Sequence, residues 1–161
     1  MARILVMGVG NILFTDEGIG VRVIEALEDA YEFSDNVTVF DGGTLGMRLM
    51  DPILHSDKLI VVDAVLGDGP PGSIYRLTGE DLRRSLAFKN SLHQTDLVDT
   101  LIYCEILGNR PDALIVGIEP EDYETMSVQL SETLSGKVPD MVDRVLEEIA
   151  KSGGSFSLRK K

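Results

Sequence analysis

The chain has 161 residues, of which 43% are hydrophobic and 26% are charged, so it suits one globular domain and neither general disorder nor a fibrous repeat. Its formal net charge of −12 disfavours a nucleic-acid partner, because such a surface repels phosphate backbones. No apolar run approaches the length of a membrane span, and a single cysteine excludes an internal disulfide framework. We therefore expect a cytoplasmic protein with no membrane partner.

The first third of the chain alternates between two hydrophobic periods. The continuous apolar run at residues 4–7 predicts a strand that is covered on both faces. Apolar residues recur at helical spacing over residues 19–31, which predicts a helix. Residues 37–40 predict a second strand, which the sequence Asp-Gly-Gly at 41–43 stops.

The middle of the chain continues this alternation. A helix is expected over residues 45–53, disturbed near Pro52. Residues 59–62 form a third apolar run and predict another buried strand. The Gly- and Pro-rich stretch 67–72 predicts a loop, and residues 73–77 predict a weaker strand that suits a sheet edge.

The last third begins with an expected helix over residues 93–107, followed by a strand over 114–118. The final helix has the clearest pattern, with apolar residues of 142–149 facing the core and polar ones, Glu148 among them, facing water. A Ser- and Gly-rich stretch at 152–155 then ends the domain.

Strands that alternate with helices predict an α/β fold, a three-layer sandwich with a mostly parallel, twisted sheet of about five strands and helices on both faces. We expect one domain over residues 1–152 and a flexible tail over 153–161. Ligands of such sheets bind beyond the carboxyl ends of the strands. Those ends are residues 8–17, 41–44 and 63–64.

Acidic residues at these ends are candidates for binding or catalysis. Glu17 lies at the expected start of a helix, where an acid also suits the helix dipole, and Asp16 suits a plain N-cap. Asp63 directly follows a buried aliphatic run. An acid there must be paired, hydrogen-bonded or bound to a metal, and the structural alternative is an aspartate that holds a loop.

The chain has two histidines. His55 is most simply a surface residue, whereas His93 lies at the start of an expected helix. If His93 projects over the same sheet edge as Glu17 and Asp63, one imidazole and two carboxylates make a site for a borderline divalent ion with open coordination positions.

Other kinds of site fit less well. The sequence Gly-Val-Gly at residues 8–10 begins like a dinucleotide fingerprint, with Asp41 in place of its ribose-binding acid, but Leu13 occupies the position of the third glycine. Neither a phosphate-binding P-loop nor a nucleophile elbow occurs. Cys104 falls on an apolar helix face and is interpreted as a core thiol.

Six short motifs are spread over essentially the whole chain. They are Gly-Val-Gly-Asn-Ile-Leu at 8–13, Thr-Asp-Glu-Gly-Ile-Gly-Val at 15–21, Asp-Gly-Gly-Thr at 41–44, Asp-Ala at 63–64, Ser-Leu-His-Gln at 91–94 and Gly-Ile-Glu-Pro at 117–120. In order and spacing they resemble the endopeptidases that mature the large subunit of nickel–iron hydrogenases. One departure is Asp96, where the family often has glycine.

The resemblance implies that the protein removes a short C-terminal extension from the large-subunit precursor, by a single cut, once nickel has been inserted. The implied partner is the nickel-loaded precursor, which carries the metal, and no nucleotide cofactor is implied. By position, Glu17, Asp63 and His93 match the residues that contact the metal. Asp41 matches a loop that matters for activity, and Asp41 and Asp16 are the candidate catalytic acids.

Two mechanisms remain open at this stage. In one, the ion polarises the scissile carbonyl or activates a water. In the other, which we favour, the ion only positions the peptide while a carboxylate, Asp41 or Asp16, acts as general base. Alternatives from other classes are a nickel carrier or sensor without catalysis, and a nucleotide-dependent oxidoreductase.

Overall fold

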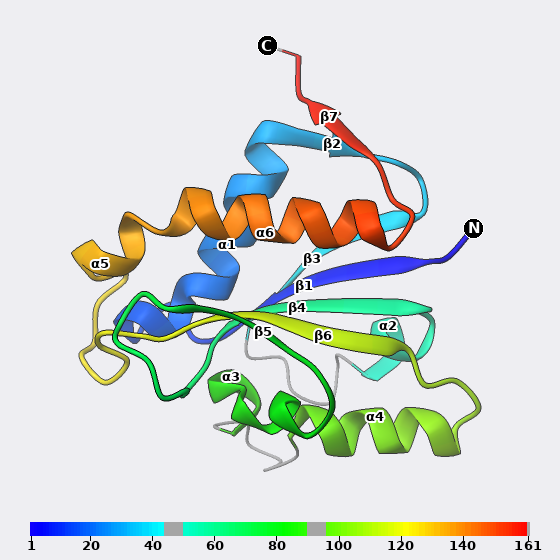
Figure 1. The fold of residues 1–161 in the computed structure, drawn as a ribbon, viewed down its shortest axis with the longest axis horizontal. Helices are drawn as coiled ribbons and strands as arrows, with labels where there is room; N and C mark the ends of the chain where they lie inside the picture. The colour runs from blue at the N-terminus through cyan, green and yellow to red at the C-terminus, as the bar shows by residue number, and fades with distance from the viewer. Residues whose placement is uncertain (44–49, 90–95, 161) are drawn as a thin grey trace.

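The computed structural model describes residues 1–43, 50–89 and 96–160, which form an α/β sandwich around one five-stranded sheet (Figure 1). The strand order is β3-β1-β4-β6-β5. The first four strands are parallel, and β5 runs antiparallel to β6 at the edge. The predicted fold class is therefore confirmed. The strands are β1 (Ile4–Val9), β3 (Val37–Gly43), β4 (Lys58–Ala64), β5 (Ile74–Leu77) and β6 (Asp112–Ile118).

The central strands are buried because both faces of the sheet are covered. Every residue of β1 is buried, and so is every residue of β4 after Lys58, as continuous apolar runs predict. Strand β3 is longer than predicted. It continues through the Asp-Gly-Gly sequence to Gly43, because Asp41 pairs with Gly8 and Gly43 pairs with Val9 on β1.

One face of the sheet is covered by helices α1 (Ile19–Ala30) and α6 (Val138–Lys151), which lie above the sheet in Figure 1. The predicted apolar face of α6 is buried as expected. One polar residue of α6 differs from expectation. Glu148 is buried rather than exposed, because its carboxylate pairs with the Arg76 guanidinium at 2.6 Å.

The other face is covered by α2 (Met50–Leu54), the 3-10 helix η3 (Gly79–Arg84), α3 (Leu86–Lys89) and α4 (Leu97–Ile106). Cys104 on α4 is fully buried, which confirms the core thiol, and burial raises the pKa of that thiol. Helix α4 begins at Leu97 because Asp96 is its N-cap. The predicted helical residues 45–49 and 93–95 lie outside the described ranges.

A second, two-stranded sheet joins β2 (Tyr31–Phe33) to β7 (Phe156–Leu158). This pairing differs from the flexible tail that we expected. The ring of Phe156 packs edge-to-face against that of Tyr31, with centroids 5.7 Å apart. Arg159 donates hydrogen bonds to the backbone oxygens of Ala30, Glu28 and Tyr31, which ties the end of the chain to α1.

Two short elements complete the described chain. They are the 3-10 helix η1 (Thr15–Gly18), which leads into α1, and α5 (Glu132–Ser135), which precedes α6. Within the described ranges, no helix is long and apolar enough to cross a membrane. His55 is exposed, as predicted for a surface residue.

Candidate active site

Glu17 reaches the carboxyl end of the sheet because two glycines allow a close approach of the backbone. A Cβ atom on Gly20 would collide with the carbonyl oxygens of Val62 and Val9, so only glycine lets α1 lie this close to β4 and β1. Gly10 has a φ of 126° and lies against the carbonyl group of Glu17. The turn after β1 therefore fixes Glu17 in η1, directly above the strand ends.

Asp63 is fully buried near the end of β4. Its Oδ2 atom accepts hydrogen bonds from the Ser85 hydroxyl and, at 3.3 Å, from the backbone N–H of Ala87. Its Oδ1 atom has no hydrogen-bond partner among the described residues. One oxygen of this carboxylate thus holds the chain around α3.

The electrostatic environment of Asp63 is unusual for a carboxylate. Burial raises the pKa of Asp63 to about 8, and the hydrogen bond from Ser85 acts in the opposite direction. The negative charge of Glu17 raises this pKa further, so the two carboxylates lie close enough to interact. A cation between them would relieve both the repulsion and the unpaired oxygen.

The structure brings together two of the three predicted metal-contacting residues. Glu17 and Asp63 meet at the carboxyl end of the sheet. His93 lies outside the described ranges. Among the residues that the structure does describe, no group of three His, Cys, Asp or Glu side chains forms a metal site.

Asp41 lies at the same end of the sheet, on edge strand β3. It pairs with Gly8 of β1, and β1 separates β3 from β4 and Asp63. Its side chain is exposed. Water and a bound polypeptide can therefore reach this carboxylate from solvent.

Asp16 has a different environment from Asp41. It is fully buried, and neither of its carboxylate oxygens is unused. They accept hydrogen bonds of 2.8–2.9 Å from the backbone N–H groups of Glu121, Asp122 and Ser131 and from the Ser131 hydroxyl. Through these hydrogen bonds, Asp16 holds the loop after β6 in place.

Sequence reasoning missed two residues that shape the site. Ser85 donates to Asp63, but no motif surrounds it, so nothing in the sequence pointed to it. Glu119 is buried, and its Oε1 atom accepts hydrogen bonds of 2.9 Å from the Gly67 N–H and the Tyr75 hydroxyl. It thereby anchors the loop that follows β4. Its place in the Gly-Ile-Glu-Pro motif was the available signal.

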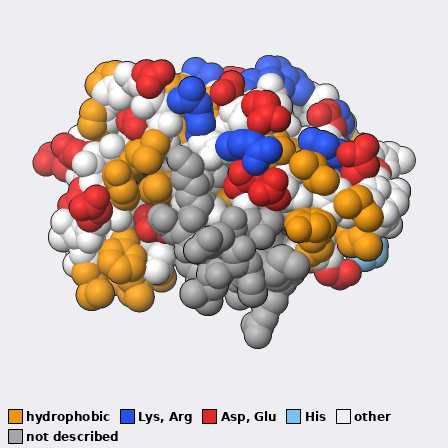
Figure 2. Space-filling view, turned by 90° about the horizontal axis from the view of Figure 1, so that it is seen from below, with side chains coloured by type: hydrophobic (Ala, Val, Ile, Leu, Met, Phe, Trp, Pro, Cys, Tyr) orange, Lys and Arg blue, Asp and Glu red, His pale blue; other side chains and the backbone are white. Residues whose placement is uncertain are grey.

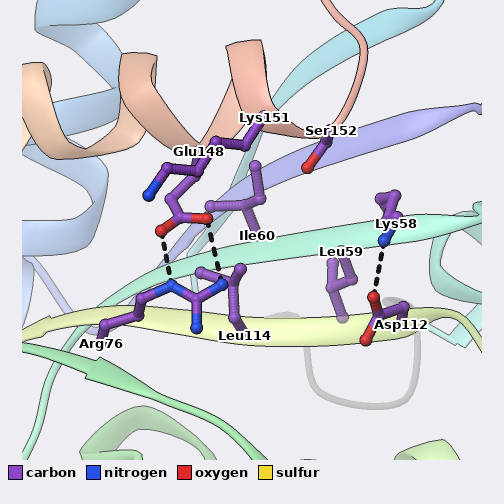
Figure 3. A pocket seen from close by; sticks show the side chains of 9 residues that line it. All are labelled: Lys58, Leu59, Ile60, Arg76, Asp112, Leu114, Glu148, Lys151 and Ser152. Atoms are coloured by element: carbon purple, nitrogen blue, oxygen red, sulfur yellow. Dashed lines mark hydrogen bonds and ion pairs between the residues drawn. The ribbon is translucent and has the colours of Figure 1, made fainter.

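A pocket of about 130 Å³ lies at the opposite end of the strands, and Figure 3 shows its lining. Lys58 and Asp112, the first residues of β4 and β6, form an ion pair of 2.6 Å there. Arg76 is paired with Glu148. Since the carboxylates of this pocket already form ion pairs with basic side chains, we do not consider it a candidate metal site.

Comparison with known proteins identifies the family. The sequence model of the hydrogenase maturation protease family matches residues 21–148. The hydrogenase 2 maturation protease of Escherichia coli K12 is 40% identical over 153 residues, which are 94% of this chain and 93% of that protein. The hydrogenase expression/formation protein HupD of Rhizobium leguminosarum bv. viciae is 37% identical over 159 residues, covering 98% of this chain and 79% of the relative.

Solved structures agree with the sequence comparisons. The hydrogenase maturating endopeptidase HybD of E. coli superposes with a TM-score of 0.86 at 38% identity, over 98% of each chain. A hydrogenase 2 maturation peptidase from a Thaumarchaeota archaeon gives a TM-score of 0.68 at 30% identity, over 91% of this chain and 97% of the other. These matches leave no support for a nucleotide-dependent oxidoreductase. The chain is a peptide hydrolase and belongs to the hydrogenase maturation protease family.

Proposed function

We propose that this protein cuts the C-terminal extension from the precursor of a nickel–iron hydrogenase large subunit, in the cytoplasm, after nickel has been inserted. The relatives are named for hydrogenase maturation, which supports a hydrogenase precursor as the substrate. The nickel carried by that precursor is the recognition signal. An empty precursor lacks the ion and is not bound productively.

The observation that carries this proposal is the state of Asp63. A fully buried carboxylate oxygen without a partner among the described residues, next to a second carboxylate, is costly unless a proton or a cation neutralises it, and a metal-bearing precursor supplies the cation. The described chain supplies two oxygen ligands and leaves the remaining coordination positions to the substrate and to His93. Such an incomplete set is poor for a stand-alone nickel carrier, whereas it suits an ion that arrives already held by the precursor.

In the proposed reaction, Asp41 accepts a proton from a water whose oxygen attacks the scissile carbonyl carbon, and it returns that proton to the leaving nitrogen as the C–N bond breaks. Its exposure at the end of β3 allows contact with both water and the substrate chain. The substrate's ion, held by Glu17, Asp63 and His93, fixes the peptide relative to that base. Asp16 acts indirectly, by holding the loop after β6 in place.

Single substitutions of the three residues proposed to contact the metal test these roles. Glu17→Gln, Asp63→Asn and His93→Ala should fold normally and lose processing of nickel-loaded precursor. The matched control is Leu146→Ala, in the core beneath α6. It should lose about 2–5 kcal/mol of stability and still cleave in the folded fraction. Normal cleavage by Asp63→Asn would contradict the assignment.

A further inference from the structure

Large hydrophobic side chains are exposed close to Glu17, at the end of the molecule that carries the loop after β6. Met126 is 73% exposed and Leu13 is 49% exposed. Figure 2 shows hydrophobic side chains gathered at this end, on the left of the view, apart from those over α4 on the right. We call Ile12, Leu13, Met126 and Val128 the apolar platform.

The platform is continuous because two distant segments pair at its centre. Phe14 and Ser127 form an isolated parallel bridge. The Ser127 N–H donates to the Leu13 carbonyl oxygen at 2.9 Å, and the Thr15 N–H donates to the Ser127 carbonyl oxygen at 2.9 Å. In this register Leu13 and Met126, each one residue before the bridge, are neighbours on the same side.

The platform is held in a defined conformation. Thr15 has a φ of 52°, a strained value for a β-branched residue, and its hydroxyl donates to the Thr125 carbonyl oxygen at 2.5 Å. Asp16 fixes both ends of the same loop, through the N–H groups of Glu121 and Ser131. A strained backbone and a buried carboxylate therefore hold exposed apolar side chains in a fixed position. This arrangement indicates a binding role for the platform.

The platform adjoins the candidate active site. Ile12 lies against Gly18, since a Cβ atom on Gly18 would come within 2.8 Å of the Ile12 Cα atom, and Gly18 directly follows Glu17. A polypeptide whose metal is held at Glu17 therefore lies next to this surface. Methionine suits such a role, because its flexible thioether adapts to different apolar side chains.

We propose that the apolar platform binds an apolar segment of the precursor next to the scissile bond and so contributes to substrate specificity. This inference rests on the proposed function. Glu121 and Glu124 are exposed in the same loop, and the net charge is −12, so an acidic segment is repelled and basic residues around the apolar segment are favoured.

Steady-state cleavage of nickel-loaded precursor by Leu13→Ser and Met126→Ser tests the platform. Each variant should raise KM about tenfold, equivalent to about 1.4 kcal/mol of binding, with little change in kcat. The matched control is Ile106→Ser on α4, because Ile106 is 74% exposed and Met126 is 73% exposed. The control should keep the KM of the wild type, and thermal melts should show that all three variants are folded.

The outcomes separate the two proposals. If the wild type does not cleave the loaded precursor, the proposed function fails. If the wild type cleaves and Met126→Ser cleaves with unchanged KM, the platform proposal fails while the function stands. A second copy of this chain could also occupy the platform, and sedimentation of the free protein measures whether it forms a dimer. A dimer that Met126→Ser abolishes, together with unchanged KM, would identify a second copy of this chain as the partner and overturn the proposal.

Discussion

At the scale of single residues, three acids at one end of the sheet occupy three different environments. Asp63 is buried with one oxygen unpaired among the described residues, Asp16 is buried with both oxygens bonded, and Asp41 is exposed. The proposed function gives each acid a different role: Asp63 contacts the cation, Asp16 positions the chain and Asp41 accepts a proton.

The raised pKa of Asp63 predicts a pH-dependent stability in metal-free protein. The folded-state pKa of about 8 exceeds the ordinary value of 3.8. The proton on Asp63 therefore stabilises the fold fully below pH 3.8, and this contribution is lost as the pH rises to about 8. Asp63→Asn cannot ionise, so its melting temperature should rise relative to that of the wild type between pH 5 and pH 9, measured in EDTA. If the melting temperatures of the variant and the wild type differ by the same amount at every pH in that range, Asp63 is not held neutral in the folded protein.

Asp16→Ala should destabilise the protein by about 3 kcal/mol, because three backbone N–H groups and one hydroxyl lose their acceptor in a buried site. Urea unfolding measures this loss. Hydrogen exchange should locate increased opening in residues 119–131. An Asp16→Asn variant that unfolds like the wild type but shows no cleavage would instead identify Asp16 as the general base.

At the scale of elements, the departure from the family pattern at Asp96 has a structural role. The Asp96 carboxylate caps α4 by accepting from the Asp99 N–H at 2.9 Å, and it also pairs with Arg83 at 2.6 Å. Helix α4, which covers the face of the sheet opposite α1 and α6, therefore has a defined start, although its sequence is apolar on most sides.

Replacing this cap tests its contribution. Asp96→Ala should cost about 1 kcal/mol of unfolding free energy, and Asp96→Gly should cost less, because glycine is a tolerated N-cap. Chemical denaturation of the two variants beside wild type measures the difference. An alanine variant as stable as the glycine variant would argue against a capping role.

Elements with strong local patterns could be predicted from sequence, and weaker ones could not. The apolar runs of β1, β4 and β6 and the two-sided pattern of α6 are local signals that the structure confirms. Strand β7 has only three residues, all exposed, and a strand of this length is too short to show a hydrophobic periodicity. Its pairing with β2 depends on Phe156 meeting Tyr31, a contact between residues far apart in the sequence.

The candidate site could likewise be predicted only in part from the sequence. The rule that ligands bind at the carboxyl ends of parallel strands is enough to place Glu17, Asp41 and Asp63 at one edge of the sheet. The partners of these residues were not predictable, because they come from other parts of the chain. Ser85, which donates to Asp63, lies 22 residues away in the sequence. The N–H groups of the loop after β6 donate to Asp16, which lies more than 100 residues earlier.

At the scale of the whole molecule, the two ends of the sheet differ in function. At the amino ends of the strands, acids and bases are matched in ion pairs. At the carboxyl ends, the carboxylates of Glu17 and Asp63 lie close enough to interact electrostatically, and exposed apolar side chains lie beside Glu17. In the proposed function, the metal-bearing precursor binds at the carboxyl ends of the strands.

In the proposed function, nickel on the precursor is the signal that the protease recognises. This is tested by incubating wild-type protein with nickel-loaded and nickel-free large-subunit precursor in parallel and following the intact mass of each. Only the loaded precursor should lose the mass of its C-terminal extension, and Asp63→Asn should leave both uncut. Cleavage of both precursors at the same rate would contradict recognition of the metal.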